Sequence, residues 1–383
     1  MGTMHNLQLA LTSGIGPILA RRLITALGSA QRVCAASIHE LQMAEGIGNT
    51  RARAIYQSLK ETADEVPREL ERSRQAGIEI ITIDDNRYPP LLRTIPDPPL
   101  VLYLMGTIEP RDLHALAIVG SRRCSYYGRE QAERFAALLA GAGLTVVSGG
   151  ARGIDSSAHR GALSHPQGRT IAVLGCGMDI VYPPENASLF KQIAGRGAVL
   201  SEYPLGTPPL QENFPRRNRI VSGMSRGVLV VEADERSGAL ITARQCIDDH
   251  NRQVFALPGR VDNPLSTGPH ELIRQGAVLT RGLEDILSEL GPLPAELEST
   301  LPPLEPIEAT EPAEPPPGKP LNINISPAGQ QILSQLDGQS ISVDQLIEQT
   351  GLPAQQVLQE LTYLTLKGLA KRVDGQSYAR TKR

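Results

Sequence analysis

The chain has 383 residues, which is enough for two or three domains at about 150 residues each. Hydrophobic residues make up 40% and charged residues 21%, as in an ordinary globular protein, and no apolar run approaches the ~20 residues that a membrane-spanning helix needs. The net charge of −3 does not indicate a nucleic-acid partner, although local clusters of charge are more informative than this sum.

Four cysteines are scattered through the chain without a CxxC pair: Cys34, Cys124, Cys176 and Cys246. This pattern argues against a disulfide framework or a zinc site and is typical of reduced thiols. The first residues, MGTMHNLQLALTSGIG, show no charged segment before a long apolar core, so no secretory signal is expected. The predicted location is the cytoplasm, with no membrane span.

Residues 1–76 are predicted to form a domain of short helices. One pattern occurs twice in it, as GIGPILA from Gly14 and as GIGNTRA from Gly46. Each copy fits a hairpin between two helices, in which the glycines allow a tight turn whose N–H groups can face a DNA phosphate. A packed helical turn that touches no nucleic acid fits equally well, and both interpretations stay open. The predicted class is a helix-hairpin-helix (SAM-like) domain.

The periodicity changes in residues 77–290, where short β-branched runs alternate with helical stretches. The predicted strands are 78–83, 101–105, 114–120, 144–149, 170–175, 198–202, 227–233 and 252–259. Segments 128–141, 155–164 and 239–250 can serve as crossover helices. The core strands are apolar along their length, as strands buried on both faces must be. The fold class predicted from this alternation is α/β, with a doubly wound, mostly parallel sheet.

The last part of the chain is predicted to be a linker followed by a small domain. Residues 291–320 hold ten prolines and six glutamates against one lysine, so this segment is expected to be a disordered acidic linker. Residues 321–383 then show three helical patterns and an alternating stretch, LAKRVDGQSYAR, around Asp374-Gly375. Three helices followed by a hairpin indicate a winged helix.

Four unusual stretches follow or separate the predicted strands. They are GSRRCSYYG (120–128), SGGARGIDSSAH (148–159), GCGMDIVYPPEN (175–186) and NFPRRNRIVSGMSRG (213–227). Ligands of open parallel sheets bind at the carboxyl ends of the strands, so these stretches are expected to meet in one groove. A dinucleotide is a poor fit, because the first loop lacks a GxGxxG spacing and the next strand ends at Ser148 instead of an acidic residue.

An enzyme acting on a nucleotide-derived substrate is the alternative to a nucleic-acid binder. Asp155 and His159 are one helical turn apart and could pair for acid–base chemistry, although a helix-start Asp and a lone His are more often structural. Glu232 and Asp234 could contact a ribose or cap the helix that begins near Ser237. No metal-ligand cluster and no GxSxG elbow is present in the sequence, so no catalytic, metal or cofactor-binding residue is predicted.

The arginines favour a nucleic acid. Arg122, Arg123, Arg129, Arg152 and Arg160 flank the glycine-rich loops, and Arg216, Arg217, Arg219 and Arg226 lie within eleven residues that contain no acidic side chain. Arginine binds phosphate through a planar fork of donors, and Phe214 beside these arginines offers a face on which a base can stack. A solvated basic face is the alternative, but four stretches of the same character predict a groove for the backbone of single-stranded DNA.

The same stretches, together with SEYPLG, VVEADERSGALITA and FALPGRVDNPLSTG, resemble the DNA-processing protein A (DprA, also called Smf) family in order over residues 118–278. The resemblance implies an extended Rossmann-like domain that binds incoming single-stranded DNA during natural transformation and helps to load RecA on it, as a homodimer without a cofactor. It also implies that Ser121, Arg122 and the Gly149–Gly150 loop hold phosphates, while Phe214 stacks beside Arg217, Asn218 and Arg219. In place of the basic residue expected before Phe214, the chain has Gln211 and Glu212.

The pattern and the resemblance together give one set of predicted DNA-binding residues: Gly120, Ser121, Arg122, Ser148, Gly149, Gly150, Arg152, Phe214, Arg216, Arg217, Asn218 and Arg219. The predicted winged helix has a third helix with little basic charge, and Lys371, Arg372 and Arg380 in the wing add a modest amount. Contact with double-stranded DNA and contact with a protein are therefore both open for the tail.

Overall fold

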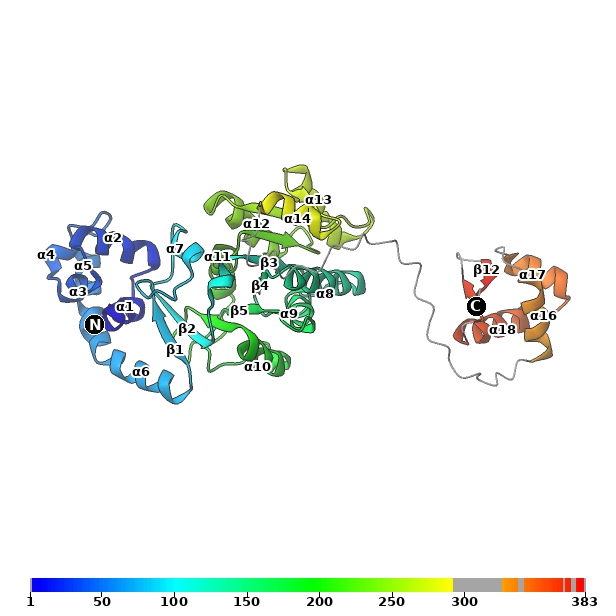
Figure 1. Ribbon diagram of the computed structural model, residues 1–383, viewed down its shortest axis with the longest axis horizontal. Helices are drawn as coiled ribbons and strands as arrows, with labels where there is room; N and C mark the ends of the chain where they lie inside the picture. The colour runs from blue at the N-terminus through cyan, green and yellow to red at the C-terminus, as the bar shows by residue number, and fades with distance from the viewer. Residues whose placement is uncertain (1, 292–325, 337–340, 368, 373–376, 382–383) are drawn as a thin grey trace. The chain divides into compact units, whose positions relative to one another are not determined.

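The computed structural model describes residues 2–291, 326–336, 341–367, 369–372 and 377–381. The chain divides into two compact units, Met1–Leu304 and Glu305–Arg383. The first contains the N-terminal helices and a large sheet, and the second contains three helices and a small sheet (Figure 1). Apart from Gly291, the predicted linker lies outside the described residues. No described helix is both long and apolar enough to span a bilayer.

The N-terminal part is helical, as predicted. Its helices are α1 (Gly2–Leu11), α2 (Pro17–Leu27), α3 (Ala30–Ala35), α4 (Ile38–Leu41), α5 (Asn49–Ala63) and α6 (Glu65–Gln75). Both GIG turns are helix-connecting turns whose first glycine has positive φ, +83° at Gly14 and +82° at Gly46, which a side chain would disfavour. The second glycine of each turn caps the next helix without a side-chain hydrogen bond.

The sheet contains all eight predicted strands and one more. The strands are β1 (Glu79–Thr82), β2 (Val101–Gly106), β3 (Ala115–Val119), β4 (Thr145–Ser148), β5 (Thr170–Leu174), β6 (Ala198–Ser201), β7 (Gly227–Val230), β8 (Gln253–Ala256) and β9 (Val278–Leu279). Their order is β1-β2-β6-β5-β4-β3-β7-β8-β9, and only the β1–β2 and β2–β6 pairs are antiparallel. The chain winds from β3 toward β6 and then crosses back to β7 on the other side of β3, which confirms the doubly wound, mostly parallel sheet.

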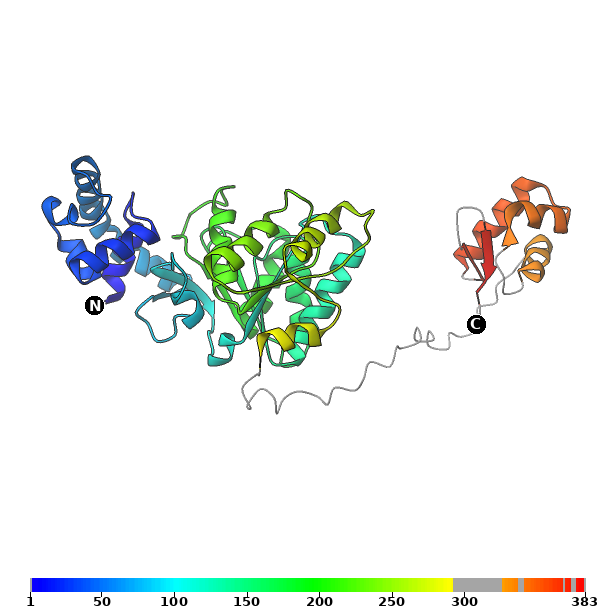
Figure 2. The same ribbon diagram turned by 90° about the horizontal axis from the view of Figure 1, so that it is seen from above.

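Helices cover both faces of this sheet (Figure 1, Figure 2). One face carries α8 (Tyr126–Gly141), α9 (Ile154–Ser164), α10 (Ala187–Arg196) and α14 (Leu283–Leu290). The other carries α11 (Asn213–Gly223), α12 (Gly238–Arg244), the π-helical turn η3 (Gln245–Asp249) and α13 (Thr267–Arg274). Short helical pieces complete this unit: α7 (Pro90–Arg93), η1 (Pro110–Leu113), η2 (Pro184–Asn186) and η4 (Pro264–Ser266). Neighbouring strand residues such as Leu116 and Ala117 pack against opposite faces, which explains why these strands are apolar throughout.

The stretch 213–227 lies between two strands, as expected, but its first eleven residues form α11, a helix that was not among the predicted crossover helices. Pro215 lies in the first turn of this helix, where no intrahelical N–H donor is needed, so it does not break the helix. Pro215 and the surrounding arginines concealed the helical pattern in the sequence.

The N-terminal helices share a hydrophobic core with the sheet. The same cluster of buried side chains includes Leu7 and Val66 from the helices and Tyr103 and Leu205 from the sheet unit. Glu69 on α6 is 5% exposed, and its Oε1 accepts hydrogen bonds from the Tyr103 hydroxyl at 2.9 Å and from the Leu205 N–H at 2.8 Å. The predicted boundary at residue 76 therefore falls inside one compact unit.

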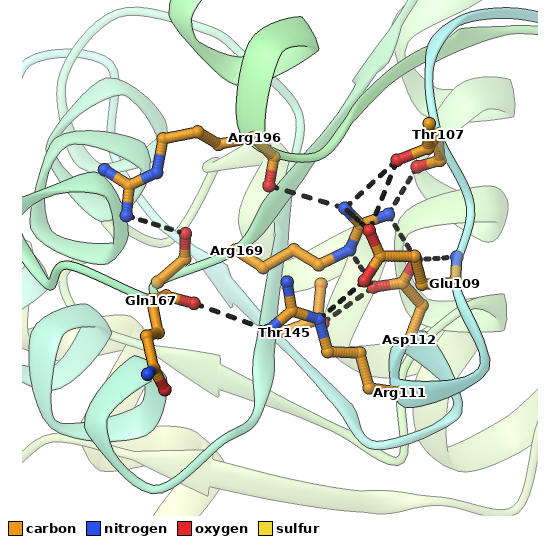
Figure 3. Close-up of polar contacts among 9 residues, drawn as sticks. Thr107, Glu109, Arg111, Asp112, Thr145, Gln167, Arg169 and Arg196 are labelled. Atoms are coloured by element: carbon orange, nitrogen blue, oxygen red, sulfur yellow. Dashed lines mark hydrogen bonds and ion pairs between the residues drawn. The ribbon is translucent and has the colours of Figure 1, made fainter.

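A polar network closes the amino ends of the strands, on the edge opposite the predicted groove (Figure 3). Arg169 is 3% exposed and binds Asp112 in a two-pronged ion pair, with Nε 2.7 Å from Oδ1 and Nη2 2.8 Å from Oδ2. Thr145, the first residue of β4, donates to the same carboxylate at 2.7 Å. Removing one partner of this buried pair would leave the other charge uncompensated, at a cost of about 3–5 kcal/mol.

The C-terminal unit is a winged helix. Its helices are α16 (Pro327–Gln335), α17 (Val343–Thr350) and α18 (Ala354–Leu366), and its strands are β10 (Ile341–Ser342), β11 (Ala370–Arg372) and β12 (Ser377–Arg380). The small antiparallel sheet has the order β10-β12-β11. Three helices and a hairpin were predicted, whereas β10 was not, because two residues are too few to show an alternation. The Asp374-Gly375 turn lies outside the described residues.

Candidate nucleic-acid interface

A groove of about 620 Å³ opens at the carboxyl ends of β3, β4 and β7. The crossover back to β7 makes this the switch point of the sheet, where ligands of such folds bind. Seven of the twelve predicted residues line it: Gly120, Ser121, Arg122, Gly149, Phe214, Arg217 and Asn218. All four of the unusual stretches contribute at least one lining residue, so the prediction that they meet in one groove is confirmed.

The loop after β3 is held in place by Glu232, which follows β7. The Ser121 N–H donates to the Glu232 carbonyl at 2.7 Å, and Ser125 donates to the Glu232 carboxylate through its N–H at 2.8 Å and its hydroxyl at 2.6 Å. A Cβ on Gly128 would lie 2.2 Å from that carboxylate, so only glycine fits there. Glu232 is 2% exposed and neither lines the groove nor caps the helix after Ser237, contrary to both possibilities raised from the sequence.

The main chain of the loop after β4 packs directly against the main chain of the loop after β3. Gly153 has φ +75°, and a Cβ on it would lie 2.4 Å from the Ser121 carbonyl oxygen. Ser148 is buried, and its hydroxyl donates to the Ile118 carbonyl at 2.7 Å. Gly150, with φ +66°, is closed off by Phe190. Ser148 and Gly150 therefore shape this loop but do not line the groove.

Arg217 forms the floor of the groove and is only 3% exposed. Its Nη1 donates to the carbonyls of Gly149 and Val173, so it ties α11 to the ends of β4 and β5. Burial lowers the pKa of this guanidinium and raises the pKa of the nearby Asp155 carboxyl, and the attraction between the two charges opposes both shifts. Nε of Arg217 has no hydrogen-bond partner among the described residues.

An aromatic and cationic cluster lies above this floor. The guanidinium carbon of Arg122 is 4.9 Å from the centroid of the Phe214 ring, a distance at which a cation and a ring face attract. The Tyr182 ring lies 5.5 Å from Phe214 at an angle of 44°. A Cβ on Gly175 would lie 3.0 Å from the Phe214 ring, so the glycine leaves room for it. Tyr182 was not singled out from the sequence, although its stretch was.

Five predicted residues do not line the groove. Ser148 and Gly150 are described above. Arg219 is 6% exposed and is paired with Asp97 at 2.9 Å and Glu202 at 2.6 Å, which makes it a structural residue. Arg152 is exposed and forms an ion pair with Glu185. Arg216 is exposed on α11 and makes no ion pair with the described residues.

The first turn of α12 forms a wall of the groove that the sequence analysis missed. Ser237 caps this helix by accepting from the Ala239 N–H at 3.3 Å, and Ser237 to Ala239 all line the groove. Asn218, on the facing α11, donates to the Gly238 carbonyl at 3.3 Å and so joins the two helices. The segment SGAL was visible in the sequence, but only the crossing of α11 and α12 places it beside the GSR loop.

The acid–base pair considered from the sequence is not assembled for catalysis. His159 is completely buried, and its Nδ1 lies 2.7 Å from the Thr170 hydroxyl. Burial lowers the pKa of this histidine to about 3. Asp155 lines the groove, whereas His159 does not. Among the described residues, no group of three or more His, Cys, Asp or Glu side chains could hold a metal ion.

Comparisons with known proteins agree with this architecture. The family model described as DNA recombination-mediator protein A matches residues 79–291. A DprA winged helix domain matches residues 308–376, and a SAM-like helix-hairpin-helix tandem matches residues 8–61. The three-part fold class predicted from the sequence is thereby confirmed.

Individual relatives resemble the chain over most of its length. It is 36% identical to Protein Smf of Synechocystis sp. over 386 residues, which cover 96% of each chain, and 40% identical to Protein Smf of Escherichia coli, with 81% of this chain and 79% of the relative covered. The crystal structure of DNA processing protein A (DprA) from Streptococcus pneumoniae superposes with a TM-score of 0.67 at 32% identity, covering 76% of this chain and 99% of that one. The chain belongs to the DNA recombination-mediator protein A (DprA/Smf) family.

Proposed function

We propose that this protein binds single-stranded DNA, without preference for sequence, in the groove at the carboxyl ends of β3, β4 and β7. The observation that carries this proposal is the pairing of an exposed cation with an aromatic ring: Arg122 lies over Phe214, and Arg123 stands beside it at the groove wall. Arginine donors suit phosphate oxygens, and a ring face accepts any base, so the combination favours a strand whose bases are unpaired.

The finer role follows from family membership. In this proposal the protein acts in the cytoplasm as a recombination mediator in DNA processing: it protects single strands that enter the cell during natural transformation and helps to load RecA on them, and it works as a homodimer. The winged helix would add contact with double-stranded DNA or with a protein. The family match supports the recombination-mediator role, and the groove supports the strand-binding step within it.

Fluorescence anisotropy tests the proposal directly. A labelled oligo-dT is titrated with the protein, and unlabelled mononucleotide is added as competitor. The expected result is binding of the oligonucleotide that weakens as salt rises, with little competition from the mononucleotide. Tight mononucleotide binding without oligonucleotide binding would instead support the alternative, an enzyme on a nucleotide-derived substrate.

A further inference from the structure

One aromatic side chain beside the groove contributes nothing to the core. Tyr126 is the first residue of α8 and is 80% exposed, which is the largest exposed fraction among the aromatic side chains of the described residues. Covering the apolar part of this ring would remove it from water, which is favourable. A ring left in this state is well suited to being covered by a ligand.

The main chain at Tyr126 is held in place by the hydrogen bonds of its two neighbours. Ser125 caps α8 by accepting from the Gly128 N–H at 3.0 Å, and Glu232 holds Ser125 through two hydrogen bonds. The next residue, Tyr127, donates its hydroxyl to the Pro258 carbonyl at 3.4 Å. Because both neighbours of Tyr126 are hydrogen-bonded, the main chain at Tyr126 is held in place while its side chain is exposed to solvent.

Tyr126 is close in the chain to a residue that lines the groove. Arg123 lines the groove and precedes Tyr126 by three residues, which span at most about 10 Å. Since a stacked strand advances about 3.4 Å per nucleotide, at most roughly three nucleotides separate a phosphate at Arg123 from a base at Tyr126.

The charge around the ring fits a nucleic acid. Arg122, Arg123 and Arg129 are exposed on the same loop and first turn. Neither Arg123 nor Arg129 makes an ion pair with the described residues, and Arg129 interacts only weakly, with the neutral thiol of Cys124, so donors of both arginines remain for phosphate. An apolar docking site for a protein would not need these three cations.

We propose that Tyr126 is a second base-stacking subsite. A base a few nucleotides along the strand from the one at Phe214 stacks on the Tyr126 ring, while phosphates between the two bases contact Arg123 and Arg129. The inference rests on the proposed single-strand binding and extends its footprint beyond the groove. It assigns to this chain two stacking platforms with a stretch of phosphate contacts between them.

The test compares oligo-dT of about 2 nucleotides, which is too short to reach both rings, with oligo-dT of about 12 nucleotides, which lies within the range of site sizes for single-strand binders. Tyr126→Ala should weaken binding of the longer strand about 5-fold or more, since loss of one stacked base removes about 1–3 kcal/mol. The shorter strand, which fills the groove alone, should bind as in the wild type. Tyr126→Phe keeps the ring and should restore the longer strand's affinity. Leu113→Ala, which alters another exposed apolar residue near the opposite edge of the sheet, is the control.

Each outcome is decisive. Equal affinity of the wild type and Tyr126→Ala for the longer strand overturns the subsite while leaving the groove intact. An equal loss in Tyr126→Ala and Tyr126→Phe overturns stacking, because only the hydroxyl is missing from the second variant. If the wild type binds neither strand, the proposed function fails, and the subsite fails with it. Melting temperatures should stay unchanged, because the side chain is exposed.

Discussion

At the scale of single residues, the arginines around the groove fall into two kinds. Arg217 and Arg219 are buried and hold main-chain carbonyls or carboxylates, whereas Arg122 and Arg216 are exposed. In the sequence all four look alike, because a basic cluster does not reveal which guanidinium is already committed. Only the exposed kind can exchange water for phosphate without leaving a buried group unpaired.

Phe214 can be separated from a purely structural role by truncation. Phe214→Ala should weaken oligo-dT binding by about 1–3 kcal/mol, because a stacked base loses its platform. The melting temperature should change little, since the ring is only partly buried and borders the groove. Phe135→Leu, on the buried face of α8, should show the reverse, with reduced stability and unchanged affinity. A large loss of stability in Phe214→Ala without loss of binding would remove it from the site.

Arg152 is held by Glu185 at 3.1 Å, and both side chains are about half exposed. Glu185→Gln should free the guanidinium for phosphate, so oligo-dT should bind more tightly at low salt and the salt slope should steepen by roughly 0.7. The gain should vanish at high salt, where charges are screened. Glu71→Gln, which frees Arg74 on α6 with the same change in net charge, is the control. Equal effects of both variants would mean that only net charge matters.

Protonation of His159 makes the free energy of unfolding depend on pH. Its pKa falls from about 6.5 to about 3 because the ring is buried, so the unfolded chain binds a proton that the folded chain does not. The contribution of this group to the free energy of unfolding is therefore fully present above pH 6.5. It is lost as the pH falls toward 3, by up to about 1.36 kcal/mol per pH unit. Denaturant unfolding at a series of pH values should show this slope in the wild type and a shallower one in His159→Gln. Identical slopes would show that the histidine takes up its proton over the same pH range in the folded protein as in the unfolded chain.

At the scale of elements, the sequence predicted what depends on local pattern. The strands from β1 to β8 were predicted because each is a run of apolar, often β-branched residues. By contrast, β9 has only two residues, and its pairing with β8 arises from tertiary packing. The glycines, Arg122 and Phe214 could be placed at the groove because they follow strand ends. Tyr182 and the first turn of α12 could not, because their positions depend on how α11 crosses between strands.

The loop from residue 203 to 212 connects β6 to α11 and carries the groove residues Pro209 and Gln211. Glu69 anchors its start at Leu205. Glu69→Ala should lower the free energy of unfolding by about 1–3 kcal/mol for each buried donor left unpaired, and should also weaken oligo-dT binding because the loop shifts. Glu69→Gln, which keeps an acceptor oxygen, should restore the affinity. Glu71→Ala, on the exposed side of the same helix, is the control.

A loss of stability without any loss of affinity in Glu69→Ala would contradict this positioning role. The N-terminal helices would then support the core and have no influence on the groove. The restoration by Glu69→Gln distinguishes the two cases, because a general loosening of the fold would not depend on one acceptor oxygen.

At the scale of the whole molecule, the groove belongs entirely to the first compact unit. A protein that ends at Gly291 should therefore keep its single-strand affinity within a few-fold, as measured by anisotropy, and should lose only what the winged helix adds. The end point matters, because Leu290 is buried and its carbonyl accepts from Arg226. A protein that ends at Arg281 loses α14 and should be less stable. If the first truncation abolishes binding while the circular dichroism spectrum stays folded, the tail is the main DNA-binding part.

Glu232 has a consequence for the speed of binding. It fixes the loop after β3 through one main-chain and two side-chain contacts, so the loop has its shape before any strand arrives. Binding of a strand then requires no slow rearrangement of the loop after β3, so the association rate should approach the limit set by diffusion. The exposed arginines should raise this rate further at low salt. Strands that differ in length should accordingly differ mainly in how long they remain bound. In the proposed role the protein holds a strand and later passes it on, and the residence time then determines when the strand is released.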